Sequence, residues 1–151
     1  MIPFLITLLT FVAMEGVAWL AHKYLMHGWL WVLHEDHHQK NPRAVLEKND
    51  NFFLIFACPG ILMLALGTFK PDMHLLFFSG LGITIYGFAY FMVHDVFIHQ
   101  RIKWFTKTDN WYFRAIRRAH KMHHKHLYKE DGECFGMLWV PLKYFKEAKA
   151  K

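Results

Sequence analysis

Ten of the twelve histidines in this 151-residue chain fall into two matched sets. Each set reads H-x4-H followed by H-x2-H-H. The first comprises His22, His27, His34, His37 and His38, and the second His94, His99, His120, His123 and His124. A lone histidine is more often a satisfied core residue than a ligand, but both spacings recurring in the same order is improbable by chance. Because neutral imidazole binds iron, zinc, copper and nickel, the repeat indicates a metal site.

Helical geometry limits how these imidazoles can converge. Positions i, i+3 and i+4 of an α-helix lie within an arc of about 100°, so each H-x2-H-H triplet is expected to point three rings at one locus. Positions i and i+5 lie about 140° apart, so an H-x4-H pair serves one site only if the helix loosens locally, as in a π-bulge. Alternatively, two metals lie close together and each histidine of the pair takes one. Ten imidazoles are too many for one ion, so we predict two metals.

Three groups of carboxylates lie near these motifs. Glu35 with His38 forms one Glu-x-x-His motif of the kind that ferritin-like dimetal proteins use, and we find no second copy. Asp36 and Asp95 are candidates to orient imidazole N–H groups, the alternative being that they are simply solvated. Glu15 lies inside an apolar stretch, where an ionisable residue is either functional or hydrogen-bonded to another helix.

The surrounding chain has the composition of a membrane protein. It is 54% apolar and 18% aromatic, and its apolar residues come in blocks. Three stretches have about the length needed to cross a bilayer: residues 1–21, 52–69 and 75–93. The first lacks the features of a cleaved signal peptide, and the last two are joined by a turn at Pro71. We therefore predict an all-α integral membrane bundle of about three transmembrane helices, forming a single domain over residues 1–151.

With three spans, all ten histidines fall on one side of the membrane. Of the eighteen Lys and Arg residues only Lys70 lies on the other side, and the positive-inside bias therefore predicts that a histidine-rich helical cap faces the cytoplasm. The formal charge of +6 does not indicate nucleic-acid binding, because the chain has no recognisable nucleic-acid module.

The remaining segments are basic and aromatic. Residues 101–129 have the composition of a helix in the headgroup region. Residues 135–145 are too short to span and contain Pro141, so we expect them at the interface, and we expect residues 146–151 to be frayed. Cys58 and Cys134 form no CxxC pair and are predicted to be reduced.

The sequence segments around the histidines resemble those of a known family. They are His22-Lys-Tyr-Leu-Met-His-Gly28, Tyr90-Phe-Met-Val-His-Asp95, His99-Gln-Arg101, Ala119-His-Lys-Met-His-His124 and Phe135-Gly-Met-Leu. They look like the boxes of the bacterial carotenoid β-ring hydroxylases, within the fatty acid hydroxylase and sterol desaturase superfamily. The resemblance runs through essentially the whole chain.

This resemblance implies that all ten histidines ligate a non-haem di-iron centre in a bacterial inner-membrane enzyme. The implied reaction inserts one atom of O2 at C3 of a β-ionone ring, converting β-carotene through β-cryptoxanthin into zeaxanthin, while the other atom leaves as water. Two electrons must come from outside, because the sequence has no flavin or nicotinamide fingerprint. The resemblance implies a ferredoxin-type donor.

The sequence leaves two other interpretations of the function open. An acyl or sterol hydroxylase or desaturase of the same superfamily would share the boxes, because boxes hold metal and the pocket selects substrate. A metal transporter or haem-binding membrane protein is less consistent with the sequence, because transporters place ligands near the midplane and haem needs few histidines. For a carotenoid, we expect the pocket walls to come from residues near the boxes: Trp19, Phe88, Phe91, Met92, Met137 and Trp139.

Overall fold

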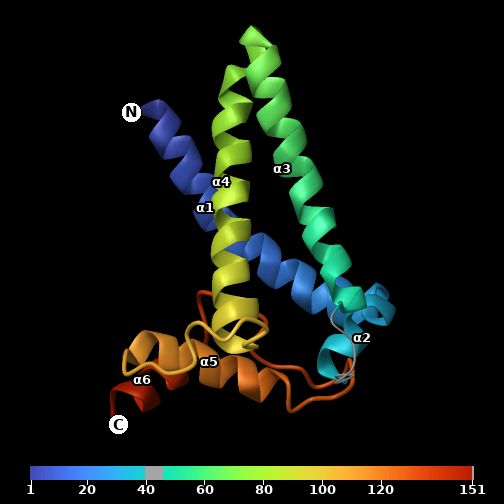
Figure 1. Cartoon of the computed structure of the whole chain (residues 1–151), viewed down its shortest axis with the longest axis vertical. Helices are drawn as coiled ribbons and strands as arrows, with labels where there is room; N and C mark the ends of the chain where they lie inside the picture. The colour runs from blue at the N-terminus through green and yellow to red at the C-terminus, as the bar shows by residue number, and fades with distance from the viewer. Residues whose placement is uncertain (40–45, 151) are drawn as a thin grey trace.

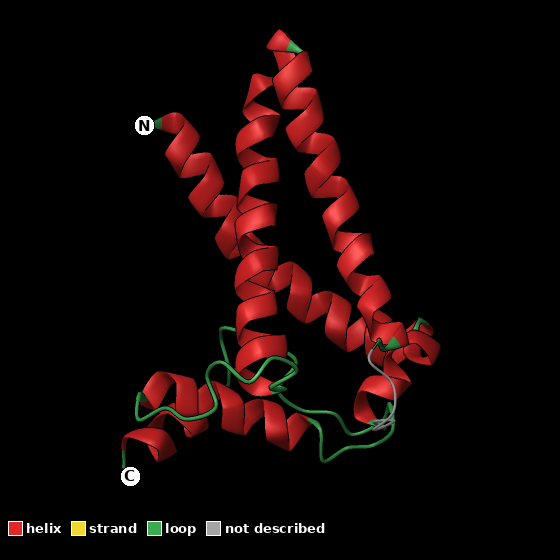
Figure 2. Cartoon of the chain, viewed as in Figure 1, coloured by secondary structure: helices red, strands yellow, loops and turns green. Residues whose placement is uncertain are grey.

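The computed structural model describes residues 1–39 and 46–150, and every regular element in these residues is helical (Figure 2). The elements in chain order are α1 (Ile2–Leu20), η1 (Ala21–Trp29), α2 (Trp31–His38), η2 (Lys48–Asp50), α3 (Asn51–Phe69), η3 (Pro71–Met73), α4 (His74–Phe91), η4 (Met92–Ile98), α5 (Trp111–His123) and α6 (Leu142–Lys149). The predicted all-α class is confirmed.

Three of the described helical segments are long and apolar enough to cross a membrane: Ile2–Trp29, Lys48–Phe69 and Pro71–Ile98. They coincide with the three predicted spans. All three extend beyond the predicted bounds, and the first and third do so at their C-terminal ends because α1 and α4 continue directly into η1 and η4. In Figure 1, α3 and α4 form a long hairpin whose tip lies farthest from the C-terminus, and α1 crosses α4.

Glycines allow close approach between these helices. A Cβ atom at Gly82 of α4 would lie 2.7 Å from the carbonyl oxygen of Thr7 and from Cβ of Thr10, both on α1. A Cβ atom at Gly67 of α3 would lie 2.3 Å from the backbone nitrogen of Phe77 on α4. Small residues at such contacts are a common way of packing membrane helices, since apolar side chains gain little from association within lipid.

The hydrophobic core lies in a cap beneath the hairpin, where α5 and α6 lie across the end of α4 (Figure 1). Helix α5 begins where the Asn110 side chain accepts hydrogen bonds from the N–H groups of Tyr112 and Phe113. The buried core side chains are Phe97, Ile98, Ala115, Ile116, Ala119, Cys134, Met137, Val140, Tyr144 and Ala148.

Two local expectations need correction. Helix α6 extends to Lys149, so residues 146–149 are not frayed: Tyr144 and Ala148 anchor the helix in the core. Within residues 101–129 the helix occupies only Trp111–His123, because the Asn110 cap begins it and it ends just before His124. Residues 135–141 form an irregular segment that buries Met137 and Val140.

Candidate metal centre

Both H-x4-H pairs lie in π-helices. Segment η1 carries His22 and His27, while η4 carries His94 and is followed directly by His99. The N–H of His99 donates to the carbonyl of His94, and the N–H of Leu30 donates to that of Leu25, both at 2.8 Å. This i to i+5 bonding brings residues five apart to about the same face of the helix. Both H-x4-H pairs therefore have the π-helical backbone that lets the two histidines of a pair serve one site.

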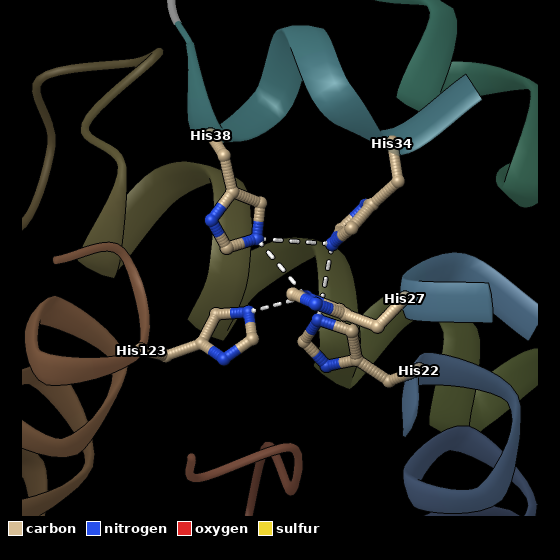
Figure 3. A group of neighbouring side chains, drawn as sticks. All are labelled: His22, His27, His34, His38 and His123. Atoms are coloured by element: carbon tan, nitrogen blue, oxygen red, sulfur yellow. Dashed lines mark hydrogen bonds between the residues drawn. The ribbon is translucent and has the colours of Figure 1, made fainter. Parts of the chain in front are cut away.

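The first cluster consists of five buried imidazoles, from η1, α2 and α5: His22, His27, His34, His38 and His123. Figure 3 shows their ring nitrogens turned toward one another. One ligand atom from each residue lies within 4.8 Å of those of the others. The Nε2 atom of His27 lies 3.2 Å from that of His38 and 3.3 Å from that of His123.

The second cluster contains His37, His94, His99 and His120, whose ligand atoms also lie within 4.8 Å of one another. His124 adjoins them, with its Nε2 atom 2.9 Å from Nε2 of His120. The two clusters meet where the ring of His38 stacks on that of His124, with centroids 4.5 Å apart. All ten histidines of the sequence repeat thus lie in one pair of adjacent clusters.

The triplets do not converge as expected from α-helical geometry. His34 and His38 point into the first cluster, but His37 between them points into the second. The second triplet mirrors this arrangement, since His123 joins the first cluster. The expectation that each triplet serves one locus is therefore wrong. The first half of the chain supplies four imidazoles to the first cluster and one to the second. The second half supplies four to the second cluster and one to the first.

The hydrogen bonds of the first cluster test whether it fits a metal ion. Each of its five rings has Nδ1 against a neutral oxygen atom, at 2.6–3.2 Å, in a position to donate. The acceptors are the carbonyls of Phe135, Lys129, His126 and Glu133 and the side chain of Asn49. A neutral ring with its proton on Nδ1 carries a lone pair on Nε2. Contacts of 3.1–3.3 Å between such Nε2 atoms bring lone pairs together, an arrangement that a bound cation would stabilise.

Burial also keeps these rings uncharged. It lowers the pKa of His34 to about 3, of His38 to about 4 and of His123 to about 2, in each case mainly because the charged ring would lose solvation. Burial lowers the pKa of His37 and His120 in the same direction. Neutral imidazole is the form that binds metal, so both clusters fit a metal-binding site.

Carboxylates contact the second cluster. Nδ1 of His37 lies 2.7 Å from Oε2 of Glu47, and Nδ1 of His94 lies 3.3 Å from Oδ2 of Asp95. Asp95 therefore lies against the Nδ1 atom of a cluster imidazole. Asp36 is placed differently, and its Oδ2 accepts a 2.6 Å hydrogen bond from the backbone N–H of Lys48. Sequence reasoning missed Glu47 and Asn49, although their place just before the second span was a usable signal.

Glu15 makes hydrogen bonds to other parts of the chain, including another helix. Its Oε1 accepts hydrogen bonds at 2.9 Å from the backbone N–H groups of Met137, Leu138 and Trp139, and its Oε2 accepts one at 2.8 Å from the Tyr86 hydroxyl. Four donors satisfy this carboxylate. It ties α1 to α4 and to the irregular segment whose Phe135 carbonyl contacts His22.

A cavity of about 600 Å³ lies between α1, α3 and α4 and reaches both clusters. His22 of the first cluster and His94 of the second both line it. Most of its wall is apolar or aromatic. Of the residues expected to line a pocket, Phe88, Phe91 and Met137 do so. Met92 instead lines a smaller pocket beside Phe97, and Trp139 is largely exposed.

Comparison with known proteins agrees with this arrangement. The family model described as fatty acid hydroxylase matches residues 7–142, so the chain belongs to the fatty acid hydroxylase family. This is an enzyme family, and the resemblance stated from the histidine boxes is confirmed. No solved structure matches the chain.

Several curated relatives have narrower names. The chain is 41% identical to the beta-carotene hydroxylase of Pantoea ananas over 91% of its own length and 77% of the relative's. It is 34% identical to the beta-carotene hydroxylase of Paracoccus sp. strain PC1, covering 93% and 86% of the two chains. It is also 40% identical to the chloroplastic beta-carotene 3-hydroxylase of Gentiana lutea, covering 86% of this chain and 40% of that one.

Proposed function

We propose that this protein hydroxylates C3 of the β-ionone rings of carotenoids, taking β-carotene through β-cryptoxanthin to zeaxanthin. The observation that carries the proposal is the apolar cavity, which leads from between the spans to one imidazole of each cluster, His22 and His94. A lipid-soluble polyene dissolves in the bilayer and can enter lengthwise, ring first. The names of the relatives support the same substrate.

The ten clustered histidines would hold two irons, one in each cluster. Bound there, iron supplies redox activation of O2, which an unactivated ring methylene requires and which side chains alone cannot provide. Overall, one oxygen atom enters the C–H bond and the other leaves as water, with two electrons and two protons supplied from outside. We assign the electrons to a ferredoxin-type donor.

The protein's own residues position and shield this chemistry. The Nδ1 contacts of the first cluster fix each ring so that its Nε2 faces the centre. Aromatic cavity residues such as Phe52, Phe88 and Phe91 surround the path to the clusters and exclude water from it. The cap places the centre at one end of the spans, which we propose is the cytoplasmic side of a bacterial inner membrane.

Pigment analysis tests the substrate. Cells that accumulate β-carotene should produce zeaxanthin when they express this chain, as seen by chromatography with mass spectrometry. Cells that accumulate lycopene should show no change, because lycopene lacks the ring methylene. Hydroxylated acyl chains together with unchanged β-carotene would assign the enzyme to another branch of the family and overturn the proposal.

A cavity variant provides a matched test of access. A Cβ atom at Gly87, which lines the cavity, would meet nothing within 4 Å, so Gly87→Phe should fill the space without disturbing the helices. Gly16, which is exposed on α1 and also open, serves as the control position. We expect Gly87→Phe to keep its iron and lose zeaxanthin formation, while Gly16→Phe keeps both. Equal activity in the two variants would exclude this cavity as the substrate path.

A further inference from the structure

The two clusters differ in the charge of the groups that contact their imidazoles. In the first cluster all five Nδ1 atoms face neutral oxygens, four of them backbone carbonyls. In the second, His37 faces the carboxylate of Glu47 and His94 faces that of Asp95. The histidine spacing is the same in both halves of the chain, but the groups that contact the imidazoles differ between the two clusters.

The carboxylates of the second cluster belong to a connected network. Arg101 donates to Oδ1 of Asp95 at 2.9 Å and to both oxygens of Asp50 at 2.7 and 2.9 Å. Asp50 in turn accepts from the backbone N–H of Glu47 at 3.1 Å. The network holds in place Glu47, which lies just before η2, and Asp95, which lies in η4. Among the residues that the structure describes, the network contains three carboxylates and one guanidinium, and the two carboxylates that face the rings each bring a negative charge to the cluster.

This charge is only partly screened by water. The side chains of Glu47 and Asp95 are 16% and 15% exposed, and the rings that they contact are 3% exposed. Electrostatic effects are stronger in such a setting than between exposed groups. Near the first cluster, the Glu133 carboxylate is paired with Lys143 at 3.0 Å, and only its carbonyl reaches His123.

A carboxylate that accepts from a ligating imidazole increases the electron density that the ring gives to a metal. Hydrogen bonding and charge around the ligands are among the main means by which proteins set metal redox potentials. We infer that the two metal positions are redox-inequivalent, with the second cluster, through Glu47 and Asp95, holding the iron that is more easily oxidised. This inference rests on the proposed function only in requiring two irons.

The structure thereby assigns Glu47 and Asp95 as positioning residues that also act through their charge. Glu47→Gln and Asp95→Asn separate these two effects, because each variant retains an oxygen that can accept from the ring but loses the negative charge. Asn49→Asp is the reciprocal variant at the first cluster, where Asn49 Oδ1 lies 2.6 Å from His34 Nδ1.

The experiment is a redox titration of the detergent-purified, iron-loaded full-length chain, followed by Mössbauer spectroscopy. The wild type should show two distinct iron signals, one of which oxidises at lower potential. Glu47→Gln and Asp95→Asn should both raise the potential of that iron and leave the other nearly unchanged. They should also weaken binding of that iron by about 10- to 100-fold. Asn49→Asp should lower the potential of the other iron, so that the two potentials approach each other.

Equal shifts of both irons, or no shift in the charge-removing variants, would overturn the inference. Because three variants bear on it, misfolding of one still leaves a decisive result. The titration contains no carotene, so an iron-loaded chain with inequivalent sites that hydroxylates no carotenoid would contradict the substrate proposal alone. A chain that takes up no iron pair would contradict both.

Discussion

At the scale of single residues, the most informative feature is the exchange of His37 and His123 between the two halves. Each is the middle histidine of a triplet whose other two members serve the opposite cluster. Because of this exchange, α2 and α5 contribute to both metal positions. Loss of either residue should therefore affect a cluster built mainly from the other half of the chain.

Replacing His123 with Ala should abolish carotenoid hydroxylation and lower the iron content, because His123 is fully buried and faces the other four rings of the first cluster. His126 provides the control. Its hydrogen bond to the centre comes from its backbone carbonyl, which faces Nδ1 of His38 at 2.7 Å, and His126→Ala keeps this carbonyl, so the variant should retain both iron and activity. Iron analysis and product chromatography on both variants check this expectation. Equal loss in the two variants would contradict it.

The ten histidines could be selected from the sequence because their spacing repeats, and a repeat needs no knowledge of the fold. Their oxygen partners could not be found this way. Four of those partners are backbone carbonyls, which any residue supplies, and Asn49 and Glu47 belong to no repeated motif. Asp36 looked suitable because it adjoins His37, but its Oδ2 accepts from the backbone N–H of Lys48, a contact that the sequence does not indicate.

At the scale of elements, the π-helix explains how an H-x4-H pair serves one cluster. Inserting one Ala after Leu25 would convert the spacing to H-x5-H. Positions i and i+6 lie about 120° apart on an α-helix, so His22 and His27 would no longer both reach the first cluster. We expect the insertion to remove iron from that cluster and to end activity. Leu25→Ala keeps the spacing at a partly exposed position and should retain both. An insertion variant with full iron content would show that the H-x4-H spacing is dispensable.

Close packing between spans gives a second element-scale prediction. Gly82→Ala places a methyl group 2.7 Å from Thr7 and Thr10, so α1 and α4 must separate, at a cost of about 1–3 kcal/mol. The control, Gly16→Ala, meets nothing within 4 Å and should change stability by no more than about 1 kcal/mol, in the stabilising direction. Thermal unfolding in detergent measures both variants, and a Gly82→Ala protein as stable as wild type would refute this contact.

At the scale of the whole molecule, the three spans were predictable because apolar blocks of sufficient length have few other uses. Their ends were not. The π-helices η1 and η4 extend the first and third spans through sequence rich in histidine, where hydropathy falls although the helix continues. The cap was also harder to predict, since its core joins segments as distant as Phe97 and Tyr144.

The distribution of basic residues predicts orientation. Lys70 is the one basic residue in the turn between the second and third spans. The other seventeen of the eighteen Lys and Arg residues lie in segments on the histidine side of the three spans. A reporter enzyme active only in the periplasm should be silent when fused after Lys151 and active when inserted at the turn near Lys70. Signal from the C-terminal fusion would require an additional span or the opposite orientation.

The central claim is that ten imidazoles form two adjacent sites that each hold one iron. Metal analysis of the purified wild-type chain tests it most directly, by the ratio of iron to protein measured alongside zinc. The account predicts about two irons per chain, with activity lost on chelation and restored by ferrous iron. A single metal per chain, or stoichiometric zinc that supports activity after iron is removed, would contradict it.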